Sequence, residues 1–220
     1  MNKNIRLIGV AILAALFSGT AAQGILEAKD LPLPKPRMEG GLPLLDALRQ
    51  RTSAREFSTD KLPIQTLSDL LWAADGINRP ESGKRTAPSA VNWQNIDIYV
   101  AAADGLYLYK PGMHALESVR TEDVREATGS QDFVKRAAIN LIYVADMSKI
   151  DRGTEREKEF NSAAHTGFIS QHVYLFCASE GLATVVRGSV DREALAGVLK
   201  LRPDQKVMLA QSVGHPEKKS

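Results

Sequence analysis

Residues 138–145 read Ala-Ile-Asn-Leu-Ile-Tyr-Val-Ala, an apolar run that only Asn140 interrupts. A run of this length without polar alternation is typical of a strand that is buried on both faces of a sheet. The sequence therefore predicts a central strand at residues 138–145, with the rest of a sheet built around it.

Other predicted strands lie on both sides of this run in the sequence. Residues 96–101 have strand-like alternation, and residues 106–109 follow them across Asp104-Gly105, a pair that favours a tight hairpin turn. Residues 182–186 and 207–213 are apolar and rich in β-branched side chains, so they are predicted as the last two strands.

Helices are predicted at residues 44–49, 63–74, 122–127, 130–138, 160–179 and 191–199. Gly181 is well placed to end the longest of them, and Asp191 to begin the last. Helices come first and a mixed sheet with intervening helices follows. This order predicts an α+β arrangement with a meander followed by crossover units.

The composition is that of one globular domain. The chain has 220 residues, of which 44% are apolar and 25% charged, enough for a sizeable core. It carries 28 basic and 26 acidic residues, but Lys3 and Arg6 supply the whole excess, so residues 23–220 carry 26 of each. Neither this balance nor the 6% aromatic content indicates a nucleic-acid partner or an anionic membrane.

The first 22 residues are typical of a secretory signal. Lys3 and Arg6 precede an apolar run at residues 7–17, and the small residues 18–22 suit cleavage near Ala22. This predicts an exported, periplasmic protein with no membrane attachment after cleavage. An uncleaved N-terminal anchor is the alternative.

Residues 23–42 contain three prolines and a Gly-Gly pair, so they are predicted to be an extended arm or linker that could wrap a partner subunit. Residues 43–220 then form the folded domain. Cys177 is the single cysteine, which excludes an intrachain disulfide, and its apolar helical surroundings predict a buried packing role.

Two short segments carry the chemistry. The first is Arg51-Thr52-Ser53-Ala54-Arg55-Glu56-Phe57, which offers two guanidiniums and two hydroxyls. A guanidinium is a planar fork that binds phosphate oxygens in pairs. Taken alone, the segment is more typical of an exposed helix cap with solvated charges.

The second segment is Ala87-Pro88-Ser89-Ala90-Val91-Asn92-Trp93-Gln94, a turn followed by two side-chain amides that both donate and accept hydrogen bonds. Alone it could be an ordinary polar loop. Together the two segments suit a ligand with a phosphate at one end and a polar heterocycle at the other, such as flavin mononucleotide (FMN).

Five segments in this order resemble the FMN-dependent nitroreductase superfamily over about residues 44–216. They are Arg-x-Ser-x-Arg-x-Phe at 51–57, Pro-Ser-x-x-Asn-x-Gln at 88–94, the helical stretch 167–175, residues 180–188, and Val-Gly-His-Pro at 213–216. Residues 171–175, Gln-His-Val-Tyr-Leu, are most similar to the branch that includes the oxidising component of thiazole- and oxazole-forming peptide systems.

The resemblance implies a nitroreductase-like α+β fold over residues 43–220, with a central, mixed, mostly antiparallel sheet flanked by helices. It also implies a homodimer that holds FMN between its subunits. Phosphate and ribityl contacts are then expected from Arg51, Thr52, Ser53 and Arg55, completed by Lys218 or Lys219, and ring contacts from Pro88, Ser89, Asn92 and Gln94.

The same resemblance places the main chain of residues 186–188 along the flavin ring, near N5 and O4. Gly188 lets the backbone approach closely, and Arg187 brings a cation that favours the anionic reduced flavin if its side chain points inward. No catalytic side chain is expected beyond the flavin itself.

The implied activity is ping-pong two-electron (hydride) transfer between a reductant and a small acceptor of nitro, quinone or enone type. NAD(P)H is the expected transient reductant. Export would place the enzyme where NAD(P)H is scarce, so a protein or quinone donor is the alternative. Two non-enzymatic alternatives are a flavin-binding or electron-relay module and a structural member without flavin.

Three histidines have open roles at this stage. His165 and His172 lie on one predicted helix, and we interpret them as core or interface residues because no third metal ligand is evident. His172 stands where the resembling branch often has Asn. His215 is expected either to contact the phosphate or to close a turn. No metal site is predicted.

Overall fold

A computed structural model describes residues 30–217. The expected signal at residues 1–22 and Lys218 and Lys219 lie outside the described residues. The strands of the main sheet are β1 (Leu31–Pro32), β4 (Ile96–Ala102), β5 (Gly105–Lys110), β6 (Ala115–Arg120), β7 (Ile139–Asp146), β8 (Ala183–Arg187) and β9 (Gln205–Gly214). The helices are α1 (Leu44–Gln50), α2 (Ile64–Asp75), α3 (Glu155–Ser179) and α4 (Arg192–Leu199). No helix within residues 30–217 is long and apolar enough to cross a bilayer.

Short elements complete the fold. A small hairpin pairs β2 (Ile77–Arg79) with β3 (Lys84–Arg85). Single 3-10 turns lie at η1 (Pro80–Ser82), η2 (Ala90–Asn92), η3 (Arg125–Thr128), η4 (Asp132–Lys135) and η5 (Met147–Lys149).

The sheet has seven strands in the order β1-β6-β5-β4-β7-β9-β8, and every neighbouring pair is antiparallel. All residues of β7 are buried, and it lies between β4 and β9. The central strand predicted from residues 138–145 is therefore confirmed, as is the α+β fold.

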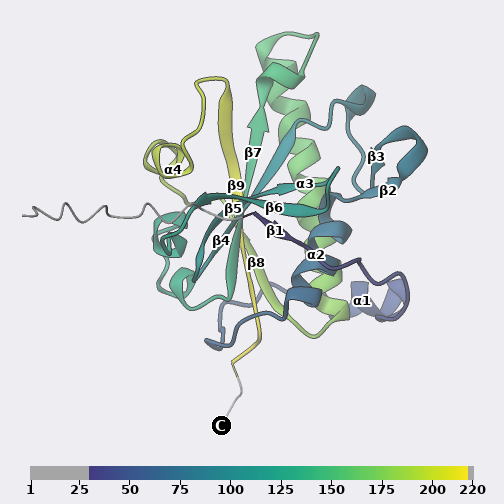
Figure 1. Ribbon diagram of the computed structural model, residues 1–220, viewed down its shortest axis with the longest axis vertical. Helices are drawn as coiled ribbons and strands as arrows, with labels where there is room; N and C mark the ends of the chain where they lie inside the picture. Colours follow the sequence, from purple (N-terminus) through teal and green to yellow (C-terminus); the bar gives the residue numbers. More distant parts are fainter. Residues whose placement is uncertain (1–29, 218–220) are drawn as a thin grey trace, which may run out of the picture.

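Helices cover both faces of this sheet (Figure 1). On one face α2 and α3 pack against inward-facing residues of β4 and β7, including Ile98, Val100 and Leu141. On the other face Leu195 and Leu199 of α4 pack against a second cluster that includes Ile142 and Val144. Alternate side chains of β7 thus pack into the cores on the two faces of the sheet, which explains why its sequence is almost entirely apolar.

Local signals set the ends of α3 and α4. Thr154 and Glu157 form a capping box at the start of α3, and Gly181 adopts a φ of +66° just after its end. The Asp191 side chain accepts a hydrogen bond from the Ala194 amide at the start of α4. Both caps that the sequence predicted, Asp191 and Gly181, are present.

Residues 30–42 run as an extended strap along α2 of the same protomer. The Ser68 hydroxyl donates to the Pro34 carbonyl at 2.5 Å, and the Arg37 guanidinium donates to Asp69 at 2.6 Å. The Leu42 amide donates to the Ser179 hydroxyl at the far end of α3. Residues 31–33 pair with β6 and the loop before it, and side chains of α2 and α3 bind the main chain of the rest of the strap.

The structure differs from the sequence prediction in two places. Residues 115–120, for which no element is predicted, form β6, because pairing with β5 overrides their weak sequence pattern. The helices expected at residues 122–127 and 130–138 are only the 3-10 turns η3 and η4. The Arg125 side chain donates to the Ala137 carbonyl and the Thr128 hydroxyl to the Arg125 carbonyl, so side-chain hydrogen bonds to the main chain replace the helical pattern.

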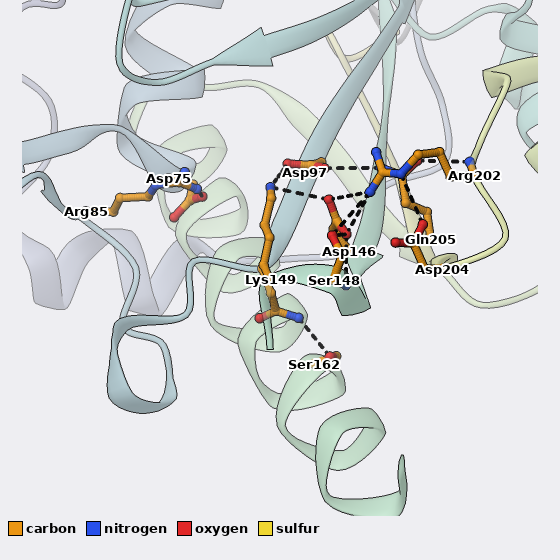
Figure 2. A network of polar contacts seen from close by, with 11 residues as sticks. Asp75, Arg85, Asp97, Asp146, Ser148, Lys149, Ser162, Arg202, Asp204 and Gln205 are labelled. Atoms are coloured by element: carbon orange, nitrogen blue, oxygen red, sulfur yellow. Dashed lines mark hydrogen bonds and ion pairs between the residues drawn. The ribbon is translucent and has the colours of Figure 1, made fainter. Parts of the chain in front are cut away.

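A polar network fixes the end of β7 (Figure 2). Arg202 donates to both carboxylate oxygens of Asp146 at 3.0 Å, and Lys149 pairs with Asp97 on the neighbouring strand β4. The Asp146 carboxylate also accepts from the Ser148 amide, which caps η5. This network ties the loop before β9 to the sheet.

Candidate functional site

The Arg51–Phe57 segment is docked by the end of α3 and the outer edge of β8. The Ser53 hydroxyl lies 2.8 Å from the Tyr174 hydroxyl, and the Ala54 amide donates to the Thr184 carbonyl at 2.9 Å. Phe57 is fully buried and forms a bridge with Pro216. The buried ring and these three contacts hold the segment in one extended path across the protein surface.

This path leaves the two guanidiniums exposed to solvent. Arg51 lies 5.4 Å from the centre of the Tyr174 ring, within cation–π range, and neither Arg51 nor Arg55 forms an ion pair with any residue of 30–217. A hollow of about 470 Å³ is lined by residues 53–56 and by Pro216 and Glu217. Two exposed cations without ion pairs, in a segment that also carries two hydroxyl groups, are a donor set that fits a phosphate. Thr52 is exposed in the same segment.

β8 is an edge strand, and its free edge faces this segment. The Val186 amide donates to the Tyr174 hydroxyl at 2.9 Å, so it is already committed to the protein. Gly188 follows two residues later and is exposed. A Cβ built there would meet only Leu209 Cδ2, at an ordinary 3.7 Å, so the fold itself leaves space above Gly188.

Arg187 turns its side chain into the core. Its guanidinium donates to the Thr128 carbonyl at 2.8 Å and to the Asn140 side chain at 3.1 Å, and Nε has no partner among residues 30–217. Burial lowers the pKa of Arg187 to about 10. Gly129 makes room for this group, since a Cβ there would lie 1.9 Å from Arg187 Nη1. The cation is thus held by neutral oxygens inside the protein.

The Pro88–Gln94 loop has an unusual backbone. Val91, Asn92 and Gln94 all have positive φ values, of 40°, 63° and 49°. Such angles are unfavourable for a β-branched residue, at a cost of about 1–3 kcal/mol, and they concentrate at functional sites. The loop exposes Pro88, Val91 and Asn92 to solvent.

Side chains within the loop stabilise this shape. The Gln94 amide group donates to the Asn92 side-chain oxygen at 3.1 Å and to the Gly83 carbonyl at 2.9 Å. The Ser89 hydroxyl accepts from the Gln94 main-chain amide at 3.0 Å. Gln94 therefore orients Asn92, and Ser89 closes the turn that presents it.

Beneath the loop lies His165 of α3. Its Nε2 accepts a hydrogen bond from the Ala90 amide at 2.8 Å, and its Nδ1 lies 2.7 Å from Asn95 Oδ1. Burial lowers the pKa of His165 below its ordinary value, which keeps the ring neutral. The interpretation of His165 as a capped core residue is confirmed.

The two loops lie at different levels of α3. Tyr174, which contacts the first loop, follows His165, which contacts the second, by nine residues. At a rise of 1.5 Å per residue this separates them by about 14 Å along the helix. One protomer thus displays the two motifs along a common helix rather than in contact.

Sequence reasoning assigned no role to Tyr174. It lies in the helical stretch 167–175, and a buried tyrosine needs a partner for its hydroxyl group, which is the signal that could have indicated its role.

The two other histidines with open roles make main-chain contacts. His172, a neighbour on the helix, makes one long contact, 3.4 Å from Nδ1 to the Ala74 carbonyl. The His215 carbonyl accepts from the Ser58 amide and so closes the strand-like pairing near Pro216.

Cys177 is fully buried in α3, and burial raises the pKa of its thiol, as expected for a packing residue. Residues 30–217 hold no group of three or more His, Cys, Asp or Glu side chains placed to bind a metal ion.

Comparison with known proteins gives the family. The model of the nitroreductase family matches residues 48–215. The chain belongs to the nitroreductase family. A Ralstonia eutropha JMP134 protein named as a nitroreductase is 42% identical, with a TM-score of 0.83 over 86% of this chain and 90% of that one. A Methanocaldococcus jannaschii protein of the same name is 32% identical, over 72% of this chain and 85% of its own length.

More distant members of known structure share the fold. A subunit of the Escherichia coli microcin synthetase complex is 19% identical, with a TM-score of 0.66 over 95% of this chain and 85% of its own. A Desulfovibrio desulfuricans nitroreductase solved in complex with FMN is 22% identical, with a TM-score of 0.59 over 80% of this chain and 88% of its own. The nitroreductase-like fold predicted from the sequence is confirmed.

Proposed function

We propose that this nitroreductase-family chain is an FMN-dependent oxidoreductase that passes two electrons from a reductant to a small acceptor of nitro, quinone or enone type. The observation that carries the proposal is the pair of exposed guanidiniums, Arg51 and Arg55, which are free of ion pairs within residues 30–217, with Arg55 at the edge of a hollow. Two cations roughly neutralise a phosphate group near neutral pH.

The chain's own residues suit the parts of FMN in turn. Arg51, Arg55 and the Ser53 hydroxyl would hold the phosphate and the sugar chain, with Thr52 beside them and Lys218 as a further cation. The free edge of β8 at Gly188 would lie against the ring, and Asn92, held by Gln94, would bind a ring edge. Bound FMN supplies the hydride chemistry, so the protein's tasks are binding, orientation and exclusion of water.

We further propose that the protein acts as a homodimer, as expected for this family. The outer face of α1 exposes Leu44, Leu45 and Leu48, and α3 exposes Phe160 and Phe168. Exposed large apolar side chains of this kind favour an interface between subunits. A second protomer could also bring its own Pro88–Gln94 loop to a flavin whose phosphate is bound by the first.

The electron donor follows from the proposed location. We propose that residues 1–22 direct export to the periplasm, where a protein or quinone donor would replace NAD(P)H. N-terminal sequencing of the chain recovered from the periplasm should then begin near Gln23. A chain that keeps Met1 and stays with the membrane would support an uncleaved anchor.

The central experiment is an absorbance spectrum of the purified protein, followed by FMN titration of the Arg51→Ala/Arg55→Ala variant. We expect a yellow protein, and a loss of FMN affinity of about 1.5–3 kcal/mol for each charge-assisted contact removed. The control is Arg49→Ala, because Arg49 is equally exposed but already paired with Asp46. If the wild type, the double variant and Arg49→Ala bind FMN with equal affinity, Arg51 and Arg55 do not contribute to the site.

Anaerobic reduction of the protein, followed by addition of an acceptor, then distinguishes an enzyme from an electron-relay protein. Rapid reoxidation of the reduced protein by a nitroarene, quinone or enone, faster than by oxygen, would support an enzyme with a small acceptor. Reoxidation only by a redox protein would support the electron-relay alternative. A colourless protein that FMN does not stabilise would refute the proposed function altogether.

A further inference from the structure

His165 is the one side chain of α3 that holds the main chain of the Pro88–Gln94 loop. It is 3% exposed and lies below Ala90, at the point where the loop enters its positive-φ residues. An amide N–H only donates, so Nε2 must present a lone pair to Ala90. The ring proton is therefore on Nδ1, which donates to Asn95.

A directed chain of hydrogen bonds fixes this tautomer. Asn95 Oδ1 accepts from His165 Nδ1, and Asn95 Nδ2 donates to the Ser162 hydroxyl at 2.8 Å. The Ser162 hydroxyl in turn donates to the Lys158 carbonyl at 2.7 Å, one turn earlier on α3 (Figure 2 shows Ser162 on this helix). Asn95 and Ser162 are fully buried, so reversing the chain would leave a buried donor unsatisfied.

The surroundings of His165 offer no ready partner for a second ring proton. The Trp93 and Phe168 rings flank it, with centres at 6.4 and 6.5 Å. A small gap beside the ring is lined by Asp75, which pairs with Arg85. The other charged groups nearby are committed as well: Asp151 accepts from Trp93, and Lys158 pairs with Glu155.

We propose that His165 is a positioning residue that holds the Pro88–Gln94 loop in its strained shape only while Nε2 carries no proton. If Nε2 carried a proton, its N–H would face the Ala90 N–H and the hydrogen bond would be lost. Val91 and Asn92 would then relax toward negative φ. The consequence for flavin affinity rests on the proposed function, whereas the effect on the loop does not.

Two variants separate the contacts of the ring. In His165→Gln the side-chain oxygen can replace Nε2 as acceptor for Ala90, and it does not titrate. In His165→Asn the side-chain nitrogen can replace Nδ1 toward Asn95, but the side chain is too short to reach Ala90. His172→Gln is the matched control, since it makes the same change on the same helix away from the loop.

The first readout needs no flavin. The full mature chain is compared by hydrogen exchange of the Ala90 amide and by imidazole nitrogen NMR. We expect an Nδ1–H signal for His165 in the wild type, and an Ala90 protection factor lowered about tenfold in His165→Asn, the equivalent of one lost hydrogen bond. Protection in His165→Gln should stay near that of the wild type and, unlike the wild type, should not fall as the pH is lowered.

The second readout is FMN titration at several pH values. Because the FMN phosphate itself takes up a proton near pH 6, variants are compared with one another at each pH. We expect His165→Asn to bind FMN about tenfold more weakly at pH 8. The ratio of wild-type to His165→Gln affinity should fall as the pH is lowered, and His172→Gln should follow the wild type.

The outcomes distinguish the two proposals. Unchanged Ala90 protection in a folded His165→Asn would overturn the role of His165, whether or not flavin binds. Lower protection without any FMN binding by the wild type would support the role in the loop and refute the flavin function. An Nε2–H tautomer in the wild type would also overturn the inference.

Discussion

At the scale of single residues, two buried ionisable groups, Arg187 and Asp75, shape the neighbourhood of the site. Arg187 is surrounded by neutral oxygens of Thr128 and Asn140, which hold it without a carboxylate. Asp75 lies next to Arg85 (Figure 2), with which it pairs, and it lines a small gap together with Pro88, Ser89 and Gln94. Both side chains of the pair are largely buried. Burying charge is costly unless every group is well paired, so these residues link the site to stability.

Asp75 gives a pH-dependent prediction. Burial raises its pKa to about 7, although Arg85 pulls it down. The folded protein therefore keeps the proton up to about pH 7, while the unfolded chain loses it near pH 4. The free energy of unfolding should thus fall, by on the order of 2–4 kcal/mol, as pH rises from about 4 to 7.

The test is urea unfolding of Asp75→Asn across this range. Asn resembles the protonated acid and does not titrate, so this variant should lack the fall in stability. Asp46→Asn, at the exposed pair with Arg49, serves as the control and should keep the wild-type slope. Parallel slopes for all three proteins would contradict the raised pKa.

Gly188 gives a prediction about ligand space. Because the fold leaves room for a side chain there, Gly188→Val should unfold at nearly the wild-type urea concentration but lose FMN binding. Gly197→Val on the exposed side of α4 should keep both. A stable, fully yellow and active Gly188→Val protein would refute the placement of the flavin ring at this edge.

At the scale of elements, α3 organises the candidate site. Its capping box, its buried stripe and its C-terminal glycine place His165 under one loop and Tyr174 under the other. A single Tyr174 hydroxyl joins the Ser53 segment to the edge of β8 through Val186. The relative position of phosphate-binding and ring-facing segments therefore depends on one rigid helix.

Tyr174→Phe tests this arrangement. The change leaves the Val186 amide without its acceptor and frees Ser53, so we expect a loss of about 1–3 kcal/mol in stability. FMN affinity should fall although Tyr174 itself is not proposed to contact the flavin, because Ser53 loses its support. Tyr107→Phe on the sheet, which is half-buried, is the matched control. Calorimetric melting measures the stability, and FMN titration measures the affinity. If both values equal those of the wild type, Tyr174 does not link the two segments of the site.

At the scale of the whole molecule, the exposed leucines of α1 indicate an incomplete surface. Leu45 is 77% exposed and Leu44 63%, although α1 packs on α3 through Ala47. Such exposure of large apolar residues is typical of a face that another chain covers. The strap at residues 30–42, by contrast, is already satisfied by its own protomer.

Leu45→Glu should shift the protein from dimer to monomer in sedimentation or gel filtration. A charge desolvated in an apolar interface is costly, so we expect dimer affinity to fall by at least about 2 kcal/mol. FMN should be lost in parallel if the flavin lies between subunits. Met113→Glu, at an equally exposed residue after β5, should change neither property. A fully dimeric Leu45→Glu protein would contradict the interface.

The sequence by itself determined the elements whose signals are local. The apolar run of β7, the hairpin turn at Asp104-Gly105, and the caps at Asp191 and Gly181 all follow from periodicity and backbone chemistry within a few residues. The order of short motifs was also enough to indicate the family.

Only the tertiary structure decided where side chains of distant segments meet. Arg125 and Thr128 form long-range or turn contacts that replace the expected helices, and β6 is a strand because β5 pairs with it. The Arg187 side chain points into the protein core because Gly129, which is far away in the sequence, leaves room for it. Likewise, only the structure shows that His165 supports a loop, because its two ring nitrogens bind Ala90 and Asn95. Hydrogen bonds between residues far apart in the sequence produce no periodic pattern from which they could be predicted.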